Sequence, residues 1–382
     1  MAQWNRVPLI DYIELIGGGT PKTTVPEYWN GNIPWLSVKD FNNDKRYVYS
    51  TEKHISQSGV ENSPTKMLHK DDIIISARGT VGEIAMIPFD MAFNQSCYGI
   101  RASRGIDQPF LYYLLKNCIS QLKRMTHGSV FDTITRDTFA NIEVDIPDAE
   151  TQKRISSVLA DIDNKIEVND AINDNLHQQA ATLFKALFVD LTPFDGTMPP
   201  NWTISTLGDA TEMGAGGDKP KESSPVKTPL CPYPIYSNGI NDYGLYGYTN
   251  DPKIKVESVT VSARGTIGYV CLRHTPYVPI VRLVTLIPDT KVLSAKYLYL
   301  YLRQLHITGT GTTQQQLTVP DFRKTEIIIP DKNTMDSFTE TVTPLFEQIW
   351  ANEDENTKLA EVRDALLPKL MSGEIDVSDI QL

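Results

Sequence analysis

The sequence predicts an α+β fold with two repeated globular domains, each followed by a long helix, and with the two helices paired as an antiparallel coiled coil. The first observation is a repeat. SARGT occurs at 76–80 and again at 262–266, and FANIEVDIP at 139–147 is matched by FRKTEIIIP at 322–330. The second observation is that each repeat ends in a helical segment with heptad spacing. A repeat of this length is a whole domain and not a solenoid unit of about 20–50 residues.

The chain divides in order into six predicted segments. They are a globular domain over 1–147, a helix over 148–190, a linker over 191–201, a second globular domain over 202–330, a second helix over 331–375 and a tail over 376–382. In the first domain, the apolar run at 73–76 and the alternating run at 142–146 predict strands, and 110–123 predicts a helix. Asp148 is a good N-cap for the first long helix, which has no Gly or Pro over 150–188.

Both long helices carry a heptad seam, which predicts that they pair. The first seam comprises Ile155, Leu159, Ile162, Ile166, Asn169, Asn173, Leu176, Ala180, Leu183 and Leu187. The second comprises Phe338, Val342, Leu345, Ile349, Asn352, Asn356, Leu359, Arg363, Leu366 and Leu370. A buried Asn costs stability but fixes the register, since it is tolerated only opposite another polar group. Antiparallel pairing satisfies this condition, with Asn169 facing Asn356 and Asn173 facing Asn352.

The same register makes two further predictions for the second helix. Arg363 lies opposite Ile162, and we expect its stem to extend outward to solvent. Kinks or breaks are expected at Pro344 and Pro368. The alternative arrangement is that each amphipathic helix packs only on its own domain.

The charge distribution restricts the classes of partner. The net charge is −11, but the globular segments 1–147 and 191–330 together hold 28 basic and 27 acidic residues. The helical segments 148–190 and 331–382 hold 8 basic and 20 acidic residues. The globular domains can therefore carry local basic grooves for a polyanion that the helices would repel. Solubility alone would also explain acidic helices.

Other features exclude several functions. No apolar run approaches the ~20 residues of a membrane span, and the first residues do not resemble a secretory signal. The 4 cysteines have no close spacing, so we interpret them as reduced core residues of a cytoplasmic protein. The histidines do not cluster at metal-ligand spacings, and no phosphate-binding GxxxxGK[ST] loop is present. The sequence therefore predicts no metal, no cofactor and no nucleotide hydrolysis.

Motifs in a fixed order run the length of the chain. They are GGTPK at 18–22, EYWNGNIPW at 27–35, DIIISARGTVG at 72–82, NQ at 94–95, QKRI at 152–155 and LPKLMSGEI at 367–375. In this order they resemble the DNA-specificity subunit of type I restriction-modification systems. The resemblance implies a subunit without catalytic activity, whose two target-recognition domains each read one half of an asymmetric bipartite site in double-stranded DNA. It implies further that the helices set the gap between the half-sites and dock two methyltransferase subunits, joined by motor-nuclease restriction subunits in the holoenzyme.

DNA reading needs donors and acceptors aimed at base edges and cations on phosphates. The Gly-rich loop, the SARGT turn and the loop before the last strand can supply them in each copy. The candidates are Thr20, Lys22, Thr23, Lys39, Arg78, Ser129, Thr133 and Arg136 in the first copy, and Lys219, Lys221, Arg264, Thr312, Thr313, Gln314, Gln315 and Gln316 in the second. Arg78 and Arg264 recur in copies that would read different sequences, which favours a phosphate or structural role for both. Ordinary polar turns would also explain the other two regions.

Two functions of other classes stay open at this point. A duplicated scaffold could bind protein or glycan ends without touching DNA. A free-standing nuclease is disfavoured, because the sequence lacks an acidic metal-binding constellation.

Overall fold

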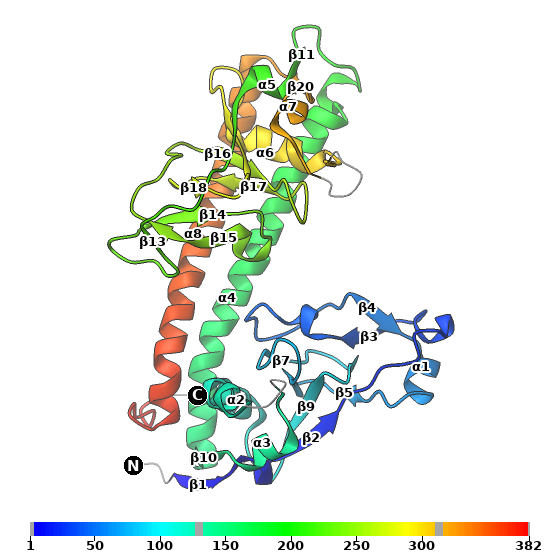
Figure 1. Cartoon of the computed structure of the whole chain (residues 1–382), viewed down its shortest axis with the longest axis vertical. Helices are drawn as coiled ribbons and strands as arrows, with labels where there is room; N and C mark the ends of the chain where they lie inside the picture. The colour runs from blue at the N-terminus through cyan, green and yellow to red at the C-terminus, as the bar shows by residue number, and fades with distance from the viewer. Residues whose placement is uncertain (1–3, 127–132, 310–315, 381–382) are drawn as a thin grey trace. The chain divides into compact units, whose positions relative to one another are not determined.

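The computed structural model describes residues 4–126, 133–309 and 316–380. The chain forms two compact units. The first unit comprises 1–171 and 352–382, and the second comprises 172–351. Each unit therefore contains one globular domain, part of the first long helix and part of the second (Figure 1).

The globular domain of the first unit contains two four-stranded sheets and a two-stranded ribbon. One sheet has the antiparallel order β2 (Ile13–Gly17), β9 (Cys97–Ala102), β6 (Ile73–Ser76), β7 (Ile84–Met86). The other has the order β4 (Lys53–Ile55), β3 (Ile33–Leu36), β8 (Met91–Phe93), β5 (Met67–Leu68), in which β3 and β8 are parallel. The ribbon pairs β1 (Asn5–Pro8) with β10 (Glu143–Ile146). The helices are α1 (Gln57–Glu61), α2 (Gln108–Thr126) and α3 (Arg136–Ala140), with 3-10 turns η1 (Leu9–Tyr12), η2 (Pro26–Tyr28) and η3 (Val38–Asp40).

The apolar run of β6 is explained by burial on both faces. Ile73 and Ile75 pack in one cluster with residues of α2, whereas Ile74 packs in a second cluster with residues of β3 and β8. Successive side chains of a strand point to opposite faces, so this sheet lies between α2 and the second sheet. The strands predicted at 73–76 and 142–146 and the helix predicted at 110–123 are confirmed.

The globular domain of the second unit repeats this architecture. One sheet has the antiparallel order β12 (Thr211–Ala215), β19 (Val284–Pro288), β16 (Ser258–Val261), β17 (Val270–Arg273). The other has the order β13 (Ser223–Ser224), β15 (Leu245–Thr249), β14 (Tyr233–Tyr236), β18 (Val278–Pro279), in which β14 and β18 are parallel. The ribbon pairs β11 (Thr203–Thr206) with β20 (Glu326–Ile329). The helices are α5 (Leu207–Ala210), α6 (Ala295–Gln304) and α7 (Val319–Phe322), with 3-10 turns η5 (Thr192–Phe194) and η6 (Asn241–Gly244).

Two long helices follow the globular domains. The first is α4 (Ala149–Phe184), which continues into the π-helical turn η4 (Lys185–Val189), and the second is α8 (Lys332–Met371). The predicted N-cap is confirmed, since Asp148 Oδ1 accepts hydrogen bonds from the backbone amides of Glu150 and Thr151 at 3.1 and 3.0 Å. These backbone hydrogen bonds lower the pKa of Asp148. Asp331 caps α8 in the same way. Among the described residues, none of the helices is both long enough and apolar enough to cross a membrane.

Both units contain antiparallel helix pairing. In the first unit, Asn169 Nδ2 donates to Asn356 Oδ1 at 2.9 Å, and Ile155 shares a core with Leu370. In the second unit, Asn173 Nδ2 is 3.4 Å from the carbonyl oxygen of Ile349. Residue numbers rise along one helix as they fall along the other, as the predicted register requires. The alternative in which each helix packs only on its own domain is therefore wrong.

The structure corrects the prediction for Arg363. Its side chain does not extend to solvent: Arg363 is 3% exposed, and Nη1 donates to Asp163 Oδ1 at 2.9 Å. The ion pair with Asp163 makes burial of the guanidinium possible, because the charge is not left without a partner.

The prediction of breaks in the second helix is also wrong. Helix α8 is continuous through Pro344 and Pro368. Both prolines lie on the exposed face, and buried residues such as Phe346 and Leu370 hold the helix in place beside them. Tertiary packing thus offsets the hydrogen bond that each proline removes.

The seam of α4 ends on different residues from those predicted. Phe184 and Phe188 are buried, whereas Leu183 is 36% exposed. Steps of four residues from Ala180 to Phe184 and then to Phe188 keep these side chains on one face. The turn η4 accommodates the second step, since a π-helical turn holds more residues than an α-helical one.

Candidate nucleic-acid interface

The SARGT turn has the same geometry in both domains. The Ser76 amide donates to Glu83 O, and the Ser262 amide donates to Tyr269 O, at 2.9 and 3.0 Å. The glycines of the two turns, Gly79 and Gly265, have φ of +78° and +68°, a conformation that favours glycine. The arginine that precedes each glycine is exposed. The repeated sequence is therefore needed to form a turn that projects an arginine.

Backbone hydrogen bonds hold this turn and three other loops of the first domain together. The Gly19 amide donates to Phe93 O at 3.0 Å, the Ala77 amide to Ser96 O at 2.8 Å, and the Ile134 amide to Ala77 O at 3.0 Å. A side chain at Gly18 would overlap the carbonyl of Asn94, which explains the need for glycine in this loop. We name the segments 18–20, 77–80, 94–96 and 133–136 the first loop cluster.

Side chains of the first loop cluster include several predicted candidates. Thr20 donates a hydrogen bond to the side chain of Gln95, and Arg78 forms a β-bridge with Thr133. Arg136 Nη2 donates to the carbonyl of Leu15 at 3.0 Å. Arg136 is therefore at least partly used in holding α3 against β2, whereas Arg78 and Gln95 are exposed.

The second domain contains a corresponding second loop cluster, formed by 216–217, 238–243, 263–266, 280–282 and 316–317. The Val281 amide donates to Gly217 O at 2.9 Å, and Asn238 Nδ2 donates to Val281 O at 2.7 Å. Asn238 Oδ1 accepts from the Ala263 amide at 2.7 Å. A single amide side chain thus connects two loops, and neither connection was predicted from the sequence.

Two short segments of the second loop cluster have strained backbones. Val281 and Arg282 have φ of +53° and +62°, and Asp242 and Tyr243 have φ of +46° and +54°. For a β-branched residue such as Val281 this conformation costs about 1–3 kcal/mol and occurs most often at functional sites. The cost is offset here by hydrogen bonds from the amides of Val281 and Arg282 to the Gly-rich loop. The side chain of Arg282 is exposed, and Asn238 links the carbonyl of the neighbouring Val281 to the SARGT turn.

The buried guanidinium of Arg273 donates a hydrogen bond to the second loop cluster. Arg273 is 6% exposed, its guanidinium carbon lies 3.6 Å from the Tyr236 ring centroid, and its Nη2 donates to Tyr243 O at 2.6 Å. Burial raises the pKa of Tyr236, so its ring stays neutral beneath the guanidinium. Arg273 therefore positions the strained loop at 242–243 rather than contacting a ligand.

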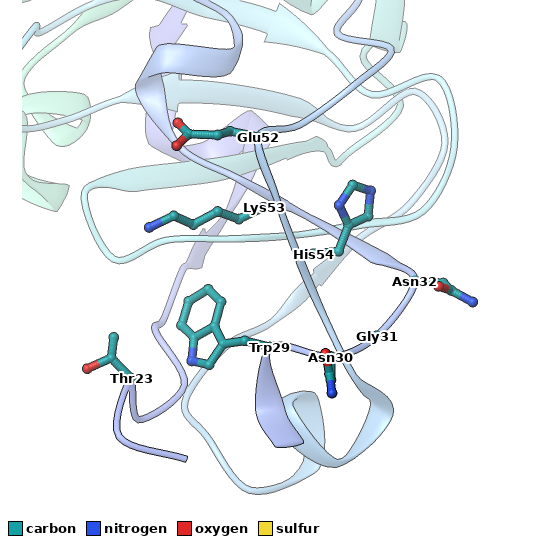
Figure 2. Close-up of a pocket in the computed structure, with 8 residues that line it drawn as sticks. All are labelled: Thr23, Trp29, Asn30, Gly31, Asn32, Glu52, Lys53 and His54. Carbon is teal, nitrogen blue, oxygen red and sulfur yellow. The ribbon is translucent and has the colours of Figure 1, made fainter. Parts of the chain in front are cut away.

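The first domain also contains an open groove of about 910 Å³ beside its Gly-rich loop. It is lined by Thr23, Trp29, Asn30, Gly31, Asn32, Glu52, Lys53 and His54 (Figure 2). The Lys53 ammonium lies 5.8 Å from the Trp29 ring centroid, and Trp29 Nε1 donates to Lys22 O at 3.2 Å. Aromatic faces, amides and a lysine are the groups that contact bases and phosphates.

The predicted candidates fall into three sets. Those that the structure brings into the loop clusters are Thr20, Arg78, Thr133, Arg136, Arg264 and Gln316, with Arg264 Nη2 donating to Gln316 Oε1 at 3.2 Å. Those on the surface outside the loop clusters are Lys22, Thr23, Lys39, Lys219 and Lys221, of which Thr23 lines the groove and Lys219 lies over the Tyr246 ring. Those outside the described residues are Ser129, Thr312, Thr313, Gln314 and Gln315.

Sequence reasoning missed several residues of these surfaces. Gln95, Asn238 and Arg282 have no local pattern that marks them, since their positions depend on pairing between distant loops. The motif NQ at 94–95 was the one signal that could have identified Gln95. Within 4–126, 133–309 and 316–380, no group of three or more His, Cys, Asp or Glu side chains could hold a metal ion.

Comparison with known proteins identifies the class. The family model for the type I restriction modification DNA specificity domain matches residues 1–178 and again 199–361. The chain therefore belongs to this family and contains its domain twice, in agreement with the two repeated sheets.

Individual relatives carry the same description. The chain is 28% identical to the type I restriction enzyme MjaIX specificity subunit of Methanocaldococcus jannaschii, across 99% of this chain and 94% of the relative. It is 26% identical to the HindI specificity subunit of Haemophilus influenzae, across 90% of this chain and 94% of the relative. Among solved structures, the S subunit of a type I restriction-modification system from M. genitalium matches with a TM-score of 0.57 at 15% identity, covering 97% of this chain and 96% of that one. This last likeness shows a shared fold.

Proposed function

We propose that the chain is the non-catalytic DNA-specificity subunit of a type I restriction-modification enzyme, and that each globular domain reads one half of an asymmetric bipartite site in double-stranded DNA. The observation that carries the proposal is the pair of loop clusters. They occupy the same strand ends in both domains, but one presents Thr20 and Gln95 where the other presents Arg282. A shared scaffold with different donors and acceptors suits the reading of two different base sequences.

The recurring arginines suit a different role. Arg78 and Arg264 project from identical turns, so they would contact the phosphate backbone, which is the same in any sequence. Charge supports the assignment of DNA to the globular domains, since their 28 basic and 27 acidic residues leave a net charge of +1, whereas the helical segments, with 8 basic and 20 acidic residues, carry −12. The groove at Trp29 lies on the same domain and would take part of the DNA backbone or an accessible base edge.

In this proposal the paired helices set the gap between the half-sites, and the two target-recognition domains span 1–147 and 202–330. The antiparallel register is fixed by polar contacts such as Asn169 with Asn356, which gives the pair a defined length. The helices would also dock two methyltransferase subunits, with restriction subunits added in the holoenzyme. Neither a metal nor a cofactor is assigned to this chain.

Single substitutions in the two loop clusters test the proposal. The chain is combined with its methyltransferase partner, and the methylated sites are mapped by sequencing that detects methylated bases. Gln95→Ala should relax one half-site and Arg282→Ala the other, because each residue belongs to one domain. A change in both half-sites from either substitution, or unchanged sites from both, would contradict the assignment.

Lengthening the helices tests the spacer. One heptad added to each of α4 and α8 at paired positions lengthens the pair by about 10 Å. The gap between half-sites should grow by about three base pairs, at ~3.4 Å each, while both half-sites stay the same. An altered half-site at an unchanged gap would count against a spacer role.

A further inference from the structure

One layer of the helix pairing in the first unit is ionic, and the ion pair at its centre is buried on both sides, whereas the two outer carboxylates are exposed. Asp163 of α4 and Arg363 of α8 are both 3% exposed, and Arg363 Nη1 donates to Asp163 Oδ1 at 2.9 Å. Tyr113 donates its hydroxyl to Asp163 Oδ2 at 2.6 Å, and the Nη2 and Nε atoms of Arg363 donate to Asp44 and Asp364 at 2.7 and 2.8 Å. Burial opposes the charge of Arg363, but hydrogen bonds to Asp364 and Asp163 raise its pKa. The guanidinium therefore stays charged inside this layer.

The corresponding layer of the second unit is apolar. The internal repeat aligns Asp163 with Phe346, Arg363 with Ala180, and Tyr113 with Leu300. Ala180, Leu300 and Phe346 are 0%, 2% and 1% exposed and belong to one hydrophobic core. The repeat therefore carries a charged layer in one unit and an alanine–phenylalanine layer in the other.

Because of this difference, the two halves of the chain, which we define as 1–196 and 197–382, carry different residues at equivalent positions of the layer. The first half contributes Asp163 and Ala180, and the second contributes Phe346 and Arg363. If two copies of the first half paired through α4 in the same register, each Asp163 would face Ala180 of the other copy. If two copies of the second half paired through α8, each Arg363 would face Phe346.

We propose that the Asp163–Arg363 layer is a pairing-specificity device, which fits the helix of each half to the complementary half and rejects a second copy of the same half. Either homotypic pair would bury two charges without their native partners across the interface, and removing one partner of a buried ion pair is strongly destabilising. Arg363 would keep Asp364, which is on its own helix, but it would lose both Asp163 and Asp44. Polar residues in a heptad seam specify partners on the same principle.

The full chain can test this after a single cut. A protease site is inserted between Gly196 and Thr197, which are both exposed, and the purified chain is cleaved. The cut protein is incubated with an isotopically labelled cut copy until labelled and unlabelled halves have exchanged, and native mass spectrometry then counts the pairs. We expect heterotypic pairs, with homotypic pairs suppressed at least ~100-fold below statistical mixing. Homotypic pairs at statistical proportions would overturn the proposal.

A second experiment transfers the charged layer to the second unit, which should allow homotypic pairing. The variant Ala180→Arg, Leu300→Tyr, Phe346→Asp gives both units a charged layer, so every combination of halves then has complementary charges. Homotypic pairs should rise by at least about tenfold over the unmodified chain. The control Gln178→Arg, Ser337→Asp adds the same charges at exposed positions and should leave pairing heterotypic.

A reverse variant covers the possibility that the charged transplant does not fold. Tyr113→Leu, Asp163→Phe, Arg363→Ala gives both units the apolar layer and should release homotypic pairing in the same way. If either folded layer variant remains as strictly heterotypic as the unmodified chain, the layer does not determine pairing. If the exposed-charge control also forms homotypic pairs, general charge is responsible and the proposal is wrong. The outcome is independent of DNA reading, which the methylation experiment tests separately.

Discussion

Replacing Phe184 tests where the seam of α4 runs. Phe184 is 1% exposed, and its ring centroid lies 5.4 Å from that of Tyr297, 5.3 Å from Phe188 and 6.1 Å from Phe338. Truncating a buried Phe to Ala costs about 3–5 kcal/mol through lost burial and the cavity that remains. Because this ring also contributes to an aromatic cluster whose pairs are each worth about 0.5–1.5 kcal/mol, we expect Phe184→Ala to fall in the upper part of that range.

The neighbouring residue provides a matched control. Leu183 is 36% exposed, so Leu183→Ala should change the free energy of unfolding by no more than about 1 kcal/mol, and the higher helix propensity of alanine offsets part of that loss. Urea unfolding followed by circular dichroism gives both free energies, with an unchanged slope as the condition for comparing them. If Leu183→Ala cost as much as Phe184→Ala, the strict heptad seam would be correct and the structural register would be refuted.

Three other outcomes can be measured on the same protein. Arg264→Ala should weaken DNA binding equally for all sequences. It should also reduce the slope of log binding constant against log salt concentration by about 1, because one phosphate contact is lost. A loss of affinity that depended on the DNA sequence would instead indicate base reading. Burial lowers the pKa of His177, so its pKa in the folded state lies below that in the unfolded state. The free energy of unfolding should therefore fall as the pH drops from about 6.5 through the folded-state pKa. His177→Phe should remove this fall when unfolding is measured as a function of pH. Burial raises the pKa of Cys97 to about 12 and that of Cys118 to about 11, whereas Cys231 is partly exposed. A thiol reagent at mildly alkaline pH should therefore modify Cys231 first. Cys231→Ser should remove the fast phase of the modification reaction.

The sequence alone predicted the parts of the fold that depend on local pattern. The apolar run 73–76 and the alternating run at 142–146 identified strands, since side-chain period and burial are local properties. Asp148 identified a helix start for the same reason. The central asparagines predicted the antiparallel register, because a polar residue in an apolar seam has few places where it can be satisfied.

The candidate site was only partly predictable. The SARGT turn, the Gly-rich loop and Gln316 could be selected by composition, and the structure places residues of each in or beside the loop clusters. The amide of Asn238, which connects Val281 to Ala263, left no pattern because its two partners come from separate loops. The positive φ of Val281 could not be expected either, since the local preference of a β-branched residue opposes it.

The amino-acid sequence by itself determined that this protein is a duplicated domain with two paired helices, because repetition and heptad spacing are visible without any long-range contact. Only the tertiary structure decided which residues end the seam of α4 and whether Arg363 in the seam of α8 is exposed or buried. Arg363 is buried because Asp44, which is 319 residues away along the chain, approaches it together with Asp163. A charge in a predicted seam can be exposed or paired, and the free energy that separates these outcomes depends on partners that folding brings together from distant parts of the chain.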